Sequence, residues 1–284
     1  MALPRVFALT SLTMIAFAAN SVLNRLALFS TDIDAATFTL VRLVTGALTL
    51  WLVVRWQRRS DNSGVTPGGS WASAGALFTY AAAFSFAYIV LETGTGALLL
   101  FGAVQLTMIG YGLWRGERFS AWQTVGFIAA LGGLIYLLLP GLSAPPLGPA
   151  FLMSLAGVAW GVYSLRGREA NRPIAESSGN FLRAAPLALA LIPLAFIFPA
   201  ETRLDGIGLL YATLSGSVTS GLGYVLWYSV LPSLRATSAA TVQLSVPVIA
   251  ALGGVLFIGE SITLRLVLAS VTILGGIAVV LRAK

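Results

Sequence analysis

Long apolar runs alternate with short polar segments along the whole chain. About 20 apolar residues in a helix span the hydrocarbon core of a bilayer, and ten runs are long enough to do so. They lie at 5–27, 35–56, 71–91, 94–114, 119–139, 148–166, 179–198, 206–231, 236–257 and 262–281. The segments between them are too short for a soluble domain. The pattern predicts an all-α integral membrane protein with ten transmembrane helices.

Composition and charge placement agree with this pattern. Only 10% of the residues are charged, whereas soluble domains carry about 25%. Cytoplasmic loops of membrane proteins carry an excess of Lys and Arg, and here the basic residues concentrate in alternate loops. One set of loops holds twelve of them: Arg5, Arg55, Arg58, Arg59, Arg115, Arg118, Arg166, Arg168, Arg172, Arg235, Arg282 and Lys284. The opposite set holds Arg25, Arg203 and Arg265, so both termini are predicted to be cytoplasmic.

One stretch of sequence occurs twice, at an offset of 143 residues. GERFSAWQTVGFIAALGG at 116–133 aligns with GESITLRLVLASVTILGG at 259–276. Each copy begins with Gly-Glu and ends with Gly-Gly. A carboxylate is favourable at the positive end of a helix dipole, so Glu117 and Glu260 are expected to cap the helices that follow them, and a role as coupling groups stays open as an alternative.

The offset divides the chain into two similar parts. Residues 1–142 and 143–284 are predicted to be two five-helix repeats that together form one transport domain. Because five is an odd number, the second repeat crosses the membrane in the opposite direction to the first. Inverted repeats of this kind allow two halves to rock around a central site. Duplication in a membrane enzyme or an assembly subunit stays open as an alternative.

Several segments resemble the drug/metabolite transporter superfamily, specifically its ten-span EamA type. They are ANSVLNRLAL and FTLVRLVTGALTL in the first half, SAATVQLSVPVIAALGGVLFIGESITL in the second, and both Gly-Glu stretches. Arg42 matches an arginine that commonly begins the second span, and Trp160-Gly161 keeps a family pattern from which Phe17 departs. The resemblance implies a secondary transporter of the bacterial cytoplasmic (inner) membrane that works by alternating access. Similarity to the aromatic amino-acid exporters of the family implies export of aromatic and other hydrophobic amino acids.

The sequence lacks the residues that most other chemistry requires. It contains no histidine and no cysteine, and no acidic residue falls in the middle of an apolar run. An enzyme needs a nucleophile–base pair or metal ligands, so the chain is predicted to be neither an enzyme nor a holder of a metal or cofactor. No G-x-x-x-x-G-K-[ST] loop is present for an ATP-driven pump. Without a basic run or an exposed aromatic platform, the net charge of +7 does not indicate nucleic-acid binding.

The expected partners are therefore a small-molecule substrate and the lipid bilayer. A ten-helix unit needs no obligatory protein partner to form a pathway, so a monomer is sufficient. Drug-like cations, purines, nucleotide-sugars and other amino acids stay open as alternative substrates.

Polar and aromatic side chains within the runs are the candidate substrate-binding residues. Lipid offers no hydrogen-bond partner to a polar group, so Asn20, Gln105, Gln243 and Ser245 either bond to other helices or line a cavity. Aromatic rings can stack on an aromatic substrate and attract its ammonium group, or they can fill space toward lipid. The aromatic candidates are Tyr80, Phe84, Trp160, Tyr163, Tyr224 and Trp227.

A second set of residues is assigned to gating or structure. Arg42 and Arg183 lie in the first third of their runs, where they extend to the lipid headgroups, take part in packing or gating, or bind a carboxylate. Pro247 removes a helical hydrogen bond and is the expected hinge. The glycine pairs of the repeated stretch complete the set: Gly132, Gly133, Gly275 and Gly276.

Overall fold

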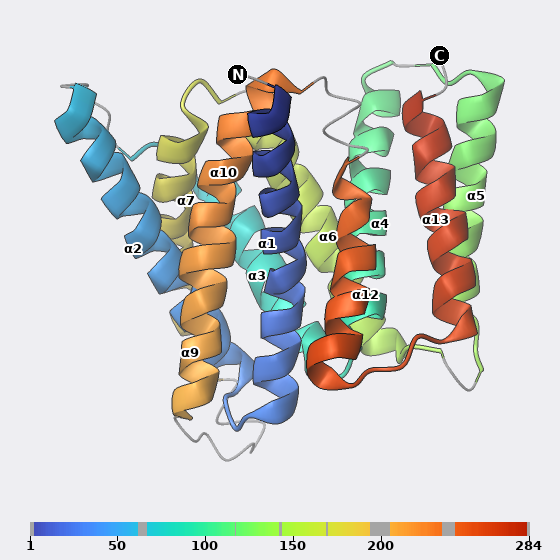
Figure 1. The fold of residues 1–284 in the computed structure, drawn as a ribbon, viewed down its shortest axis with the longest axis horizontal. Coiled ribbons are helices and arrows are strands. Elements are labelled where there is room, and N and C mark those ends of the chain that lie inside the picture. Colours follow the sequence, from blue (N-terminus) through green and yellow to red (C-terminus); the bar gives the residue numbers. More distant parts are fainter. Residues whose placement is uncertain are drawn as a thin grey trace.

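The computed structural model describes residues 3–61, 67–116, 118–141, 144–168, 170–193, 205–234 and 242–282. All regular structure within these residues is helical, and they contain no strand. Figure 1 shows the helices running side by side as one bundle. The first residues of α1 and the last residues of α13 lie at the same end of it (Figure 1).

The helices follow the predicted apolar runs. They are α1 (Leu3–Ser30), α2 (Ala35–Asp61), α3 (Trp71–Tyr88), α4 (Thr93–Trp114), α5 (Ala121–Leu138), α6 (Leu147–Arg168), α7 (Pro173–Ala188) with η1 (Leu189–Leu191), α9 (Gly206–Leu214), η2 (Ser215–Leu222), α10 (Gly223–Val230) with η3 (Leu231–Ser233), α12 (Ser245–Ile258) and α13 (Leu264–Arg282). The segments α9, η2 and α10 continue one another without a break in the chain, so they act as one long helix.

Seven helical segments in the described residues are long and apolar enough to cross a membrane. They are Leu3–Ser30, Ala35–Gln57, Thr93–Trp114, Ala121–Leu138, Leu147–Arg168, Gly206–Ser233 and Leu264–Arg282. Large apolar side chains such as Phe7, Ile15 and Leu256 are exposed, as expected where lipid is the solvent. The all-helical fold predicted from the sequence is confirmed, and the chain is a multi-pass membrane protein. The count of ten spans stays a prediction, because α3, α7 and α12 fall outside this group of seven.

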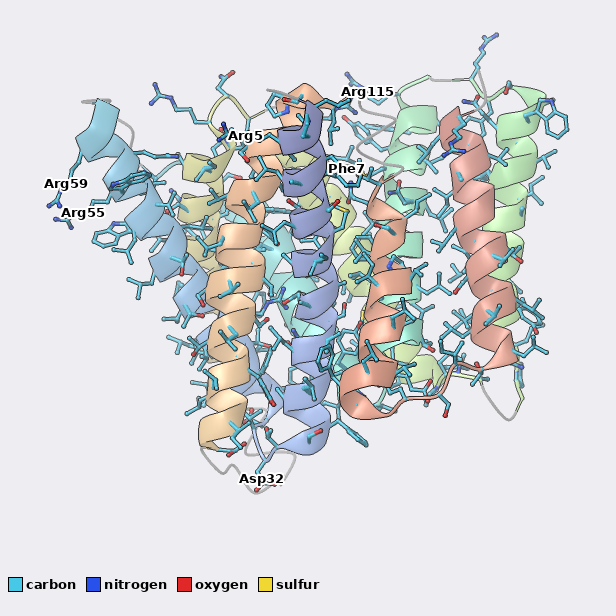
Figure 2. The ribbon with its side chains drawn as sticks, viewed as in Figure 1. Arg5, Phe7, Asp32, Arg55, Arg59 and Arg115 are labelled. Carbon is cyan, nitrogen blue, oxygen red and sulfur yellow. The ribbon has the colours of Figure 1, made fainter. Side chains whose placement is uncertain are left out.

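Basic side chains gather at the end of the bundle where α1 begins. Figure 2 shows Arg5, Arg55, Arg59 and Arg115 at that end and Asp32 at the opposite end. All four arginines belong to the loops and helix ends that the sequence groups on one side of the membrane.

Helices that are distant in the chain pack closely against each other. α5 contacts α13, α2 contacts α7, and α6 contacts both α3 and α4. Small residues permit the closest approaches. A Cβ on Gly157 of α6 would meet the carbonyl oxygen of Leu100 in α4, and one on Gly276 of α13 would meet that of Gly126 in α5. These two helix pairs are therefore held at backbone contact.

The segment η2 is a π-helix, which the sequence analysis did not predict. Its sequence, SGSVTSGL, consists mainly of small residues, and a Cβ on Gly216 would meet the carbonyl oxygen of Arg42 in α2. The hydroxyls of Ser215 and Thr219 both reach α1, where they donate to Asn20. π-helical segments are rare and occur frequently at functional sites. This one brings a row of hydroxyl groups to the centre of the bundle.

Candidate functional site

A small cavity lies among α1, α3, α4, α6, η2 and α10. Its lining consists of Phe17, Asn20, Ser21, Tyr80, Phe84, Leu100, Phe101, Trp160, Thr219, Ser220 and Tyr224. The cavity volume is about 20 Å³, which is close to the least that holds one water molecule. The aromatic rings fill most of the space, so a larger ligand requires the surrounding helices or rings to move.

Trp160 is at the centre of the aromatic part of the lining. Its ring centroid lies 4.9 Å from that of Tyr80, 5.2 Å from that of Tyr224 and 5.4 Å from that of Tyr163, on which it stacks. The ring of Phe84 lies 5.4 Å from that of Tyr80. Rings from α3, α6 and α10 thus meet at one place and present flat apolar faces to a ligand.

Asn20 is at the centre of the polar part of the lining. Its Oδ1 accepts hydrogen bonds from the hydroxyls of Ser215, at 2.7 Å, and Thr219, at 3.1 Å. Its Nδ2 donates to the Tyr80 hydroxyl at 3.2 Å. Asn24, one turn later, donates to the Asn20 carbonyl oxygen at 2.9 Å. This network joins α1 to α3 and η2. It also supplies the hydrogen-bond partners that lipid could not offer to the Asn20 side-chain amide.

Arg42 lies next to this network and does not extend to the membrane surface. Its side chain is only 2% exposed. Its Nη2 donates to the Tyr80 hydroxyl at 2.9 Å, and its Nη1 has no hydrogen-bond partner among the described residues. Of the three roles that the sequence left open, contact with headgroups is therefore excluded for this arginine.

A second polar cluster lies where α1, α3, α4 and the segment before α13 meet. Arg25 Nε donates to Glu260 Oε1 at 3.2 Å, and neither side chain is more than 10% exposed. Arg25 Nη1 also donates to the carbonyl oxygens of Tyr88, at 3.1 Å, and Ile89, at 2.9 Å. The Glu260 carboxylate accepts from the backbone N–H of Thr93 at 2.8 and 3.0 Å. The ion pair thus ties the end of α3 to the start of α4.

The expectation that Glu260 caps the helix after it is wrong. In the first turn of α13, the N–H of Leu266 donates to the Thr263 hydroxyl at 3.1 Å instead. Glu260 caps α4 through Thr93. The physical reason is the one expected, a carboxylate at a positive helix end, but the helix comes from the other half of the chain. Glu117 lies outside the described residues.

Glu92, directly before α4, lies beside this ion pair. Burial and the nearby Glu260 carboxylate raise the pKa of Glu92 above its ordinary value, and Arg25 partly offsets them. The folded protein therefore binds this proton more tightly than the unfolded chain does. It follows that the free energy of unfolding decreases as the pH rises through the carboxyl range.

We therefore expect Glu92→Gln to stabilise the protein at about pH 7 and to have little effect at about pH 4, below the ordinary carboxyl pKa. For a half-exposed charge the gain is about 0.2–1 kcal/mol. Thermal unfolding in detergent at several pH values measures it. A gain that is larger in acid than at neutral pH would contradict the assigned direction of the pKa shift.

The predicted binding residues divide into two groups. Those that line the cavity are Asn20, Tyr80, Phe84, Trp160 and Tyr224. Tyr163 lies behind Trp160 and donates to Ser177 Oγ at 3.2 Å. Trp227 packs against Phe17, with ring centroids 6.0 Å apart.

The other three predicted residues also lie outside the lining of this cavity. Gln105 is buried in α4, and its Nε2 has no hydrogen-bond partner in the described part of the chain. Ser245 donates to the carbonyl oxygen of Val242 at 2.6 Å. Gln243 lies in the short helical stretch just before α12.

The structure gives several gating or structural candidates a definite position. Arg183 donates to the carbonyl oxygens of Gly68 and Gly179, at 2.6 and 2.9 Å. Pro247 is buried in the first turn of α12, close to the turn at Leu244. Among the glycine pairs, Gly133 and Gly276 face the contact between α5 and α13, whereas Gly132 and Gly275 have no neighbouring atom where a Cβ would be.

Helical spacing could have found some of the lining residues that were not selected. Phe17 lies three residues before Asn20 and four residues before Ser21, so it shares a helix face with each of them. Ser220 likewise lies four residues before Tyr224. Phe101 lies four residues before the candidate Gln105, so the same spacing could have found it, whereas Leu100 has no candidate residue at such a spacing.

The chain is similar to known proteins along most of its length. An uncharacterized protein of Pseudomonas aeruginosa is 56% identical over 281 residues, which cover 99% of this chain and 96% of that protein. The uncharacterized transporter YoaV of Bacillus subtilis is 23% identical, with 87% of each chain covered. An uncharacterized transporter of Archaeoglobus fulgidus is 27% identical over 69% of this chain and 70% of its own length.

Two further comparisons concern the family and the fold. The sequence profile of the EamA-like transporter family matches residues 147–282, which lie within the second predicted repeat, 143–284. A solved crystal structure superposes with a TM-score of 0.63 at 20% sequence identity, covering 96% of this chain and 99% of that one. At this identity the likeness concerns the arrangement of helices alone.

Proposed function

Because the chain belongs to the EamA-like transporter family, we propose that it is a secondary transporter that exports small metabolites, most favourably aromatic and other hydrophobic amino acids. The cavity carries this proposal, since it combines the ring faces of Tyr80, Trp160 and Tyr224 with the amide of Asn20. Binding sites for small molecules have mostly apolar walls with a few polar groups that fix orientation. Once the helices or rings move to admit a larger ligand, an aromatic side chain would lie against the rings and the polar end of an amino acid beside the amide.

The pattern of helix contacts supports alternating access between two inverted repeats. In this proposal α1 to α5 are the counterparts of α6, α7, the α9–η2–α10 segment, α12 and α13. Exchanging the counterparts turns the α1–α12 contact into the α6–α4 contact, and the α1–α10 contact into the α6–α3 contact. The contacts of α2 with α7, α4 with α12 and α5 with α13 are unchanged by the exchange. One half can therefore rock against the other around the cavity.

The ion pair of Arg25 with Glu260 suits the closed end of such a mechanism. The arginine-rich end in Figure 2 favours cytoplasmic termini in the inner membrane, and in this proposal the Arg25 end of α1 faces the outer side. An offset of 143 relates Arg25 to Arg168 and Glu260 to Glu117. The sequence therefore repeats the two charges on the other side. We infer that the outer pair holds the pathway closed toward the outside.

Transport by the purified protein in liposomes tests the proposed function. The assay compares labelled tryptophan, phenylalanine and threonine with a cationic dye, and protein-free liposomes provide the background. Flux of tryptophan and phenylalanine is the expected result. Flux of threonine or the dye without that of the aromatic amino acids would exclude the proposed substrate class.

Trp160→Ala is expected to raise the half-saturation concentration for tryptophan and phenylalanine about two- to tenfold, because stacking contributes about 0.5–1.5 kcal/mol. Expression should stay at the level of the wild type. Trp122→Ala is the matched control, because Trp122 is 70% exposed at the start of α5 and distant from the lining. Equal transport by the two variants would remove Trp160 from the site.

A further inference from the structure

Arg42 carries a buried positive charge for which the structure describes no acidic partner. The arginine guanidinium stays protonated in proteins, so this charge is permanent. Within the described residues the ion pair of Arg25 and Glu260 does not involve it, and no carboxylate bonds to it. A buried charge is costly unless an opposite charge compensates it, and ionisable groups at membrane depth generally mark a substrate pathway.

We propose that Arg42 and Tyr80 form a carboxylate-binding subsite, so that the substrates are aromatic carboxylates whose ammonium group is not required for binding. The inference rests on the proposed function and narrows its substrate class. The carboxylate of the ligand supplies the counter-charge that Arg42 lacks. Aromatic amino acids belong to this class because they carry a carboxylate, and aromatic amines do not.

The position of Arg42 supports this role, because it lies directly behind the cavity wall. Its guanidinium carbon is 5.0 Å from the ring centroid of Tyr80 and 5.1 Å from that of Phe84, and both rings line the cavity. The planar guanidinium can donate two parallel hydrogen bonds to a carboxylate. With Nη1 unpartnered in the described residues, a small shift of either ring gives a ligand access to it.

The Tyr80 hydroxyl connects this charge to the cavity. Its oxygen accepts hydrogen bonds from Arg42 Nη2 at 2.9 Å and from Asn20 Nδ2 at 3.2 Å. Those two bonds use both acceptor positions of a phenolic oxygen, and the hydroxyl donates to no residue in the described part of the chain. Its proton is therefore available to a ligand. Charge-assisted hydrogen bonds are the strong ones, which favours an anionic oxygen as the acceptor.

The lining has no corresponding group for an ammonium ion. Among the described residues, none of those that line the cavity is Asp or Glu, and Asn20 Oδ1 already accepts from two hydroxyls. Aromatic faces attract cations, but the Arg42 guanidinium already lies against two of the rings. Its charge repels a second cation near them. The site therefore distinguishes the two ends of an amino acid by charge.

Arg183, which corresponds to Arg42 in the repeat, provides an internal contrast. Two backbone carbonyl oxygens, those of Gly68 and Gly179, accept hydrogen bonds from its Nη1. It does not line the cavity, and its bond to Gly68 ties α7 to the segment that leads into α3. The two arginines therefore differ in their contacts: one is bonded to the backbone and the other lies against the cavity wall.

Calorimetric titration of the purified protein tests the subsite with four ligands of similar size: phenylalanine, 3-phenylpropionate, phenylalaninamide and phenethylamine. Both carboxylates are expected to bind at least about tenfold more tightly than the amide and the amine. Equal affinity for 3-phenylpropionate and phenylalaninamide overturns the proposal, and so does failure of all four to bind. The wild type alone decides these outcomes, whether or not a variant folds.

Variants assign the preference to Arg42. Arg42→Gln is expected to weaken 3-phenylpropionate binding at least about tenfold and to leave phenethylamine binding unchanged or tighter, whereas Arg183→Gln keeps the wild-type order. An unchanged preference for acids in Arg42→Gln overturns the assignment. Liposome flux is measured separately, because acid-selective binding without amino-acid flux rejects the transport function alone. Amino-acid flux without acid selectivity rejects the subsite alone.

Discussion

Glu260→Gln is expected to reduce transport at least about tenfold and to lower the free energy of unfolding by about 3 kcal/mol. The substitution removes one partner of a buried ion pair and leaves the charge of Arg25 uncompensated. It also weakens the cap on the Thr93 N–H at the start of α4. If the pair closes the outer end, its loss leaves that end open, and the halves no longer alternate.

Thiol labelling separates this effect from simple destabilisation. The chain contains no cysteine, so Ser21→Cys alone reports access to the cavity. Labelling of Cys by a membrane-impermeant reagent added outside should increase when Glu260→Gln is added to Ser21→Cys. Glu92→Gln is the control, because it removes a neighbouring carboxyl that is outside the ion pair. Reduced transport with unchanged labelling would show that the pair stabilises the fold without gating it.

Exchanging the two charges should not restore the wild-type behaviour. Arg25 bonds to carbonyl oxygens at the end of α3, and Glu260 bonds to an N–H at the start of α4. Carbonyl groups at a helix end favour a cation, and N–H groups favour an anion. The double variant Arg25→Glu with Glu260→Arg keeps the ion pair, but it puts the carboxylate beside the carbonyl groups at the end of α3 and the guanidinium beside the N–H groups at the start of α4. Recovery of transport would show that the pair acts by mutual attraction alone.

The sequence could predict the helices because their cause is local. Each apolar run is long enough to cross a bilayer, and short polar segments end it. The sequence could not predict which face of a helix turns inward, because lipid removes the contrast between interior and exterior that marks a face in water. Trp160 and Gln105 looked equally suitable in their runs, yet only Trp160 lines the cavity.

Arg42 and Glu260 show the same limit for charged residues. In the sequence, Arg42 and Arg183 occupy corresponding places. The residues near them do not predict that one guanidinium is buried and that the other is bonded to a loop. The difference comes from Tyr80 and Gly68, which belong to other segments. Glu260 likewise finds its helix N-terminus in the other half of the chain. The local sequence indicates that a charged side chain needs a hydrogen-bond partner or an opposite charge. Only the packing of helices determines which residue supplies that partner.

The same reasoning predicts a reversal of charge selectivity at the cavity. Asn20→Asp should weaken binding of 3-phenylpropionate about a hundredfold and allow phenethylamine to bind. The new carboxylate has nearly the shape of the amide and still accepts from Ser215 and Thr219. Two unit negative charges about 6 Å apart repel by about 3 kcal/mol at an effective dielectric constant of about 20. The new negative charge also compensates the positive charge of Arg42, so a ligand carboxylate is no longer needed as its counter-charge.

Calorimetric titration with both ligands measures the reversal. Asn180→Asp is the matched control: Asn180 is a buried amide that does not line the cavity, and its Oδ1 accepts from the Ser70 N–H at 2.9 Å. That variant should keep the wild-type preference for 3-phenylpropionate over phenethylamine, because its charge lies outside the lining of the cavity. Wild-type affinity for 3-phenylpropionate in Asn20→Asp would mean that the ligand carboxylate lies away from Asn20. Loss of binding for both ligands would mean that the amide fixes the shape of the site and that its charge does not set selectivity.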